Sequence, residues 1–274
     1  MTPSIDRTNF DKHWLEYSVS NREGRFNKFR LKEKENSRDL IKNSLSEAVL
    51  LHHMEPDEIQ ICLDLLEYNE LTKEIAKRLP SRTIERKDDK TQRNTVRIGN
   101  FGEIVAAEHL CQCYGYSIPI FKLRYAVSNE IAMPGEDIVL FTISDDEQIE
   151  SILFGEVKTL KKYNGNKVVE AHDRLNKIYE IDPVTLYFIS RSLIKEKNPL
   201  GKQIMKILNI IGLNDFPTEN WIFIITGNEP IDPFRRIFEM QDVAKNLSVI
   251  SLHLPDLPDF IDEIFDLATK IPRC

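Results

Sequence analysis

The sequence predicts an α/β protein in which a mixed β-sheet is flanked by helices and follows a mainly helical N-terminal region. Two observations favour this class. The chain has 274 residues, of which 41% are hydrophobic, so it can bury a sizeable core. From about residue 98 onward, short apolar runs typical of strands alternate with patterns at helical spacing, the order found in α/β domains.

The N-terminal region, residues 1–95, is expected to contain two amphipathic helices. Apolar residues recur at helical spacing over residues 39–54, and Pro56 then begins a second helical pattern that ends at Pro80. Residues 81–97 are polar and charged, which indicates a linker or an exposed arm. We therefore expect a helical region at 1–95 and an α/β domain at 96–274.

The α/β domain is expected to begin with a helix over 99–115, which three strands then follow in succession. The second and third of these strands, 136–143 and 152–160, flank an acidic stretch that indicates the turn of an antiparallel hairpin. The remaining predicted elements are the strands 117–127, 185–190, 221–226 and 247–254 and the helices 168–181, 193–211 and 258–270. Because some of these strands follow one another directly and others alternate with helices, a mixed sheet is expected.

Composition limits the classes of function. With 37 basic and 44 acidic residues the net charge is −7, which argues against a protein that coats nucleic acid by bulk electrostatics. The four cysteines lack the spacing of a zinc site and suit free thiols in a reducing cytoplasm. The sequence has no apolar run long enough for a membrane helix and no apolar signal core at its start, so a cytoplasmic protein without a membrane partner is expected.

A charged pair interrupts the apolar strand at 152–160. Glu156 and Lys158 should point to the same face because side chains alternate along a strand, and buried charges need a partner, a metal ion or solvent. Asp137 stands at the start of the preceding strand, so the hairpin can bring it beside Glu156. Two carboxylates that lie close together repel unless a cation joins them, and hard oxygen ligands suit Mg²⁺ or Mn²⁺.

A third carboxylate, Glu103, falls on the helix that precedes the sheet. At helical spacing it shares the apolar stripe of Ala106, Ala107 and Leu110, whereas Glu108 should point away from this stripe. An acid on a buried stripe is unusual and indicates a site.

The ordered set of Glu103, a Gly-x-Asp motif and a Glu-x-Lys motif resembles the PD-(D/E)XK nuclease superfamily. The matching motifs are Pro134-Gly135-Glu136-Asp137 and Glu156-Val157-Lys158, and the resemblance covers about residues 96–190, as a restriction-endonuclease-like core. Within that superfamily, the segments RIGNFGEIVAAEHL, GEDIVLF and FGEVKT look like the HamA family, the nuclease subunit of Hachiman anti-phage defence systems.

The resemblance implies metal-dependent hydrolysis of phosphodiester bonds in DNA, with Mg²⁺ or Mn²⁺ as the cofactor. Asp137 and Glu156 would hold the metal directly, Glu103 would bind it or a second metal through water, and Val157 would offer its carbonyl oxygen. Lys158 would position or help deprotonate the attacking water and stabilise the developing negative charge. Whether Lys158 acts as the base or as a counter-charge stays open at this point.

Two basic clusters lie N-terminal to the carboxylates. One falls within residues 22–34, and the other extends from Arg78 to Arg97. The second cluster supplies the candidate contacts to DNA phosphates, namely Arg82, Arg86, Arg93 and Arg97. The alternative for both clusters is a solvated surface.

The resemblance also implies a partner. The chain has no Gly-x-x-x-x-Gly-Lys-Ser/Thr loop for ATP, so an ATP-driven motor would be a separate helicase subunit that is HamB-like. Two alternatives remain: a stand-alone restriction-like or repair nuclease, and a nuclease fold retained only for binding.

Overall fold

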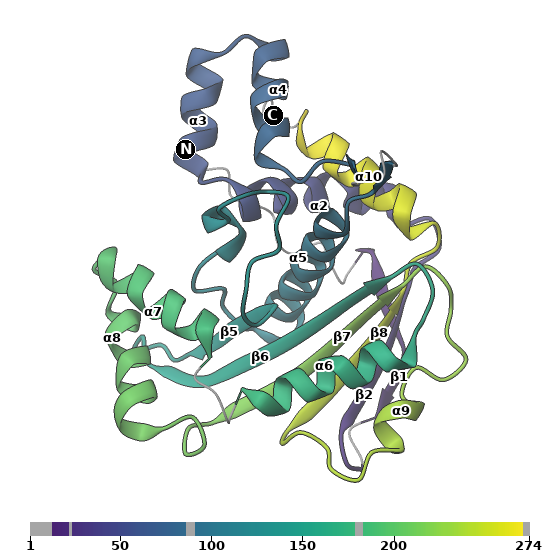
Figure 1. Cartoon of the computed structure of the whole chain (residues 1–274), viewed down its shortest axis with the longest axis vertical. Helices are drawn as coiled ribbons and strands as arrows, with labels where there is room; N and C mark the ends of the chain where they lie inside the picture. The colour runs from purple at the N-terminus through teal and green to yellow at the C-terminus, as the bar shows by residue number, and fades with distance from the viewer. Residues whose placement is uncertain (1–12, 22–23, 86–90, 179–182, 271–274) are drawn as a thin grey trace.

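A computed structural model describes residues 13–21, 24–85, 91–178 and 183–270 (Figure 1). Its centre is a six-stranded sheet, and Figure 1 shows helices on both faces of it. In spatial order the strands are β1 (Leu15–Asn21), β2 (Asn27–Glu33), β8 (Leu247–His253), β7 (Thr218–Thr226), β6 (Ile149–Leu160) and β5 (Ile138–Ile143). The pairs β2–β8, β8–β7 and β7–β6 are parallel, whereas β1–β2 and β5–β6 are antiparallel. The predicted mixed sheet and the predicted β5–β6 hairpin are therefore confirmed.

The sheet separates two hydrophobic cores. On one face, Trp221 and Phe223 of β7 belong to a core shared with α2 (Arg38–His53), α5 (Thr95–Tyr114) and α10 (Leu257–Ala268). On the other face, Ile222 and Ile224 pack in a core shared with α6 (Gly165–Lys177), α7 (Val184–Lys195) and α8 (Pro199–Lys206). Because both faces are covered, the central strands are apolar at nearly every position, which explains why they were easy to recognise.

Helix α5 is held close to the sheet by a glycine. The side chain of Asn94 accepts a hydrogen bond from the backbone N–H of Val96 and so caps the start of the helix, which ends at Gly115 in the left-handed conformation. Inside the helix, a Cβ atom on Gly102 would lie 1.9 Å from Oγ1 of Thr159 on β6. Only glycine allows α5 to approach β6 this closely, and this contact places Glu103 near the hairpin.

Helix α5 is buried on more than one side. We expected Glu108 to point away from the apolar stripe, but its exposed fraction is only 2%, and His52 of α2 contacts its carboxylate at 2.9 Å. The reason is that α2 packs against the side of α5 that does not face the sheet. Glu103 is the more exposed of the two acids, with 19% of its side chain accessible.

The N-terminal residues contribute two strands to the main sheet, which the sequence analysis did not anticipate. Alternation in β2 buries Phe29 and Leu31, whereas Lys28 and Arg30 are half-buried and Lys32 is exposed. These basic side chains favour the interpretation of the segment as a basic cluster. Helices α2, α3 (Pro56–Leu65) and α4 (Tyr68–Arg78) follow, and Figure 1 shows the α3–α4 pair at one end of the molecule. The polar arm at 81–97 contains the short hairpin of β3 (Thr83–Glu85) and β4 (Thr91–Arg93) and the first turn of α5.

Two predicted strands are wrong. Residues 185–190 belong to helix α7, because a short run of apolar and aromatic residues does not by itself distinguish a strand from a buried helix. Residues 117–127 make a single bridge, between Ser117 and Phe141, and then a 3₁₀ turn, η1 (Lys122–Tyr125). The helical pattern at 193–211 is divided among the end of α7, α8 and a π-helical turn, η2 (Ile207–Ile211). The described C-terminal part also includes the short helix α9 (Arg235–Phe238).

No helix within the described ranges combines the length and the apolar character needed to cross a lipid bilayer.

Candidate functional site

The β5–β6 hairpin brings Asp137 and Glu156 together. Ile138 pairs with Gly155, so Asp137, one residue before β5, lies opposite the position of Glu156. The ammonium of Lys158 joins the two carboxylates, at 3.0 Å from Oε2 of Glu156 and 3.7 Å from Oδ2 of Asp137. The backbone N–H of Val157 donates to Oδ2 of Asp137 at 2.8 Å and so fixes this carboxylate.

This carboxylate pair lies at the edge of the buried core. Glu156 is 2% exposed and Lys158 retains 15% of its side-chain area, so the charges are screened by little water. Burial, and then the neighbouring carboxylate of Asp137, raise the pKa of Glu156, while Lys158 and Arg174 act in the opposite direction. The site therefore concentrates negative charge and depends on cations to hold it.

Arg174 is a member of the site that the sequence analysis missed. It projects from the last turn of α6 and donates from Nη1 to Oε2 of Glu156 at 3.1 Å, and the same nitrogen lies 3.9 Å from Oδ1 of Asp137. More than half of its side chain, 57%, is exposed. Nothing local to the sequence links this residue to Glu156, which lies 18 residues earlier on a strand.

Glu103 faces the hairpin from α5, but it forms an ion pair with Lys122 and not with Lys158. Its Oε2 atom lies 2.9 Å from Nζ of Lys122, which also donates to the backbone carbonyl of Glu136 at 2.8 Å. Burial raises the pKa of Glu103 to about 7, and Lys122 opposes this effect. Glu103, Asp137 and Lys122 together line a small cavity of about 40 Å³, enough space for a water molecule.

The donor atoms suit a hard divalent cation. Mg²⁺ is commonly bound by one or two carboxylates with water and phosphate oxygens completing its shell, and Asp137 and Glu156 form such a pair. Over the described ranges, no three or more His, Cys, Asp or Glu side chains are gathered as a metal-binding group. The carboxylate pair supplies two such ligands, and Val157 anchors it by packing in the core with 8% exposure.

A groove opens beside the carboxylate pair. It has a volume of about 690 Å³ and lies between the start of α5, the end of β6 and α6. Its charged lining residues are Lys158, Lys167, Glu170, Asp173, Arg174 and Lys177. Four of these six are basic, which makes the groove a local exception in a chain of net charge −7.

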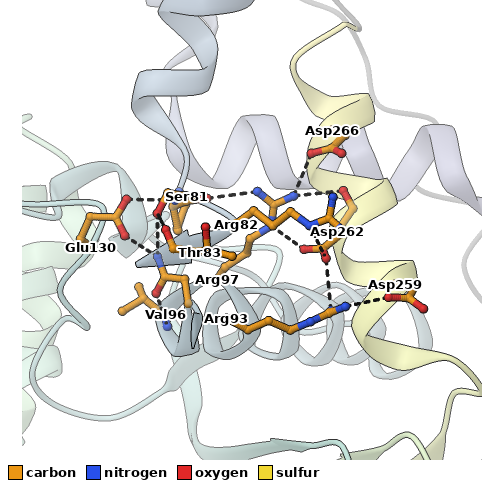
Figure 2. Close-up of polar contacts among 12 residues, drawn as sticks. Ser81, Arg82, Thr83, Arg93, Val96, Arg97, Glu130, Asp259, Asp262 and Asp266 are labelled. Atoms are coloured by element: carbon orange, nitrogen blue, oxygen red, sulfur yellow. Dashed lines mark hydrogen bonds and ion pairs between the residues drawn. The ribbon is translucent and has the colours of Figure 1, made fainter. Parts of the chain in front are cut away.

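The arginines of the second basic cluster have acidic partners. Figure 2 shows Arg82, Arg93 and Arg97 extending toward the aspartates of α10. Asp262 lies within 2.9 Å of Arg82, 3.2 Å of Arg93 and 3.4 Å of Arg97, and Asp259 and Asp266 take further contacts with Arg93 and Arg97. Arg86 lies outside the described residues. Contact of these arginines with DNA remains a prediction, and it would compete with the aspartates.

Two arginines of the first basic cluster bind the protein's own backbone. Arg25 donates to the carbonyl groups of Met240 and Gln241, and Arg30 donates to those of Pro230 and Ile231. These bonds tie the N-terminal strands to the loops that precede β8. A role in fold stability accounts for both side chains.

The fold and site together define a three-layer α/β protein with a carboxylate–lysine cluster on a β-hairpin at one end of its sheet. A model of the HamA family matches residues 8–268, and the chain therefore belongs to the HamA family. The Hachiman protein HamA of Bacillus cereus is 29% identical to it over 185 residues. The alignment covers 66% of this chain and 62% of that protein, so less than two thirds of the relative's length is spanned.

Proposed function

We propose that this chain is a metal-dependent deoxyribonuclease of the PD-(D/E)XK type that serves as the nuclease component of a Hachiman anti-phage defence system. The observation that carries the proposal is the Asp137–Glu156 pair with Lys158 between the two carboxylates. Membership of the HamA family supports the link to anti-phage defence. Mg²⁺ or Mn²⁺ is the proposed cofactor.

Each residue of the pair has a defined task in this proposal. Asp137, held by the N–H of Val157, and Glu156, fixed in the strand, supply the oxygen ligands. When bound, a divalent cation would supply charge neutralisation at the scissile phosphate and lower the pKa of a coordinated water. Lys158 would orient the attacking water and stabilise negative charge that develops on the phosphate, since its ammonium is already fixed by two carboxylates.

Glu103 and Val157 act in support of this pair. Glu103 would reach the site through water in the small cavity that it shares with Asp137, on the side of the hairpin covered by α5. The main chain of Val157 would contribute its carbonyl oxygen to the metal.

The proposed complex includes a helicase subunit that is HamB-like, with DNA as the common substrate. The net charge of −7 gives the isolated chain little general attraction to DNA, so loading by a motor subunit suits its electrostatics. Cleavage is then confined to DNA that the partner has engaged.

A Mg²⁺-dependent cleavage assay on plasmid and linear DNA tests the proposal, with the protein alone and with the product of the neighbouring gene. Glu156→Gln and Lys158→Met should abolish cleavage and leave the protein folded. Glu150→Gln is the matched control, because Glu150 is an exposed acid on the same strand. Unchanged cleavage by the Glu156→Gln, Lys158→Met double variant would refute the assignment. Sequence-specific cleavage without a partner would instead indicate a stand-alone nuclease.

A further inference from the structure

Two cations already neutralise the two carboxylates of the proposed metal site. Lys158 reaches Glu156 and Asp137 from the strand, and Arg174 reaches the same two residues from α6. A divalent cation at this pair would face both of these positive groups at short range, and like charges so close repel. Withdrawal of one of the two cations would relieve this repulsion when a metal binds.

The two cations differ in their freedom to move. Lys158 lies on β6 with 15% of its side chain exposed, between Glu156 and Asp137. Both side chains line the 690 Å³ groove beside the site, but 57% of the Arg174 side chain is exposed. Arg174 is thus the cation with room to leave, and the groove is where it would go.

A phosphate chain bound in the groove would give Arg174 a second anionic partner. Lys177 lines the groove from the same helix as Arg174, and so does Lys167, whose ammonium contacts Glu170 at 2.7 Å. A chain of phosphates would therefore meet positive groups along α6 and would compete with Glu170 for Lys167. A guanidinium is suited to this exchange because its planar fork matches the oxygens of both carboxylates and phosphates.

We propose that Arg174 is a displaceable counter-ion, which holds Asp137 and Glu156 before a divalent cation arrives and then turns into the groove to bind a DNA phosphate. This inference rests on the proposed function for the identity of the metal and of the phosphate chain. It makes metal binding and DNA binding cooperative, since each removes an obstacle to the other.

The first test measures Mn²⁺ binding to the full chain by electron paramagnetic resonance, without DNA. Arg174→Gln should lower the dissociation constant for Mn²⁺ about tenfold or more, because the competing charge is gone. Lys177→Gln is the matched control, since it removes one positive charge from the same helix and groove, and it should change the constant less than twofold. Arg174→Lys keeps a positive charge but replaces the planar guanidinium fork by a single ammonium, and it should give an intermediate value. An Arg174→Gln protein that melts like wild type but binds Mn²⁺ no more tightly overturns the proposal.

The second test measures binding of a labelled 20-base-pair duplex in Ca²⁺ and in EDTA. Arg174→Gln should weaken binding several-fold in Ca²⁺ only, whereas Lys177→Gln should weaken it in both conditions. If Arg174→Gln weakens duplex binding equally in Ca²⁺ and in EDTA, the proposed movement of Arg174 into the groove is wrong. These results are separable from the proposed function. If Arg174→Gln binds Mn²⁺ more tightly but the wild-type chain never cleaves DNA, the role of Arg174 as a counter-ion is supported and the proposed nuclease activity is not.

Discussion

Nζ of Lys158 lies 3.0 Å from Oε2 of Glu156, two residues earlier on the same strand, and 3.7 Å from Asp137 on its neighbour. One ammonium therefore serves two carboxylates that repel each other. This arrangement links stability to the proposed chemistry, because the group that would stabilise charge on the phosphate also stabilises the folded hairpin.

Lys158→Met should lower both cleavage and stability. Glu156 is almost fully buried and would keep only Arg174 as its cation, so the free energy of unfolding should fall by about 1–3 kcal/mol. Cleavage should fall at least about 100-fold. Urea denaturation and the plasmid assay measure the two effects. Wild-type stability in the variant would mean that Lys158 is not needed as a counter-charge.

Gly102→Ala should separate α5 from the sheet. The added Cβ would meet Thr159 at 1.9 Å and Cγ1 of Val157 at 3.0 Å, so the helix has to shift, at a cost of about 1–3 kcal/mol. Gly99→Ala on the same helix is the control, because nothing lies within 4 Å of its Cβ position, and it should stabilise the helix by roughly 0.5–1 kcal/mol. Thermal melting measures both variants, and equal melting temperatures would contradict the close contact.

Asp262→Asn should loosen the junction between the polar arm and α10. Asp262 is 6% exposed and contacts three arginines, of which Arg97 is itself buried, so the loss should be about 2–4 kcal/mol. Asp259→Asn removes an exposed partner of Arg93 and should cost less than about 1 kcal/mol. Chemical denaturation of the two variants gives the comparison. Similar losses would show that the cluster acts only as a set of surface ion pairs.

The site was predictable where it depends on local chain geometry. Alternation along one strand puts Glu156 and Lys158 on the same face, and a hairpin between adjacent strands puts Asp137 beside them. The sequence pattern therefore predicts that these three residues lie together. Arg174 and Lys122 were not predictable in this way. Their positions at the site depend on how α6 and the segment before β5 pack on the sheet, which no periodicity encodes.

The elements of the fold likewise differ in whether local sequence or tertiary packing determines them. The central strands and α5 were recognisable because apolar runs and apolar helical spacing define them locally, although α5 begins at Thr95 and not at the predicted residue 99. Residues 27–33 have an equally regular alternation, but the basic side chains at the alternate positions favour the interpretation of a charged surface. Only the parallel pairing with β8 at the far end of the chain shows that they complete the sheet.

Acid should destabilise the protein through His53. This side chain is buried between α2, α5 and α10: Nδ1 donates to the carbonyl of Val49, Nε2 accepts from Asn100, and the ring meets Phe265 edge to face. Burial lowers the pKa of His53 from 6.5 to about 4, with a smaller contribution in the same direction from His52. The neutral imidazole with its proton on Nδ1 is thus the form that satisfies both hydrogen bonds of His53.

The sign of the pH effect follows from that shift. Below pH 6.5 the unfolded chain binds a proton at His53 that the folded chain rejects, so stability is lost as the pH falls from about 6.5 to about 4, by up to roughly 3 kcal/mol. His53→Gln should be less stable at pH 7.5 but should lose less stability on acidification to pH 4.5. Urea denaturation across this range measures the difference. A ring titration of His53 by NMR with a midpoint near 6.5, or equal acid losses in both proteins, would contradict the assignment.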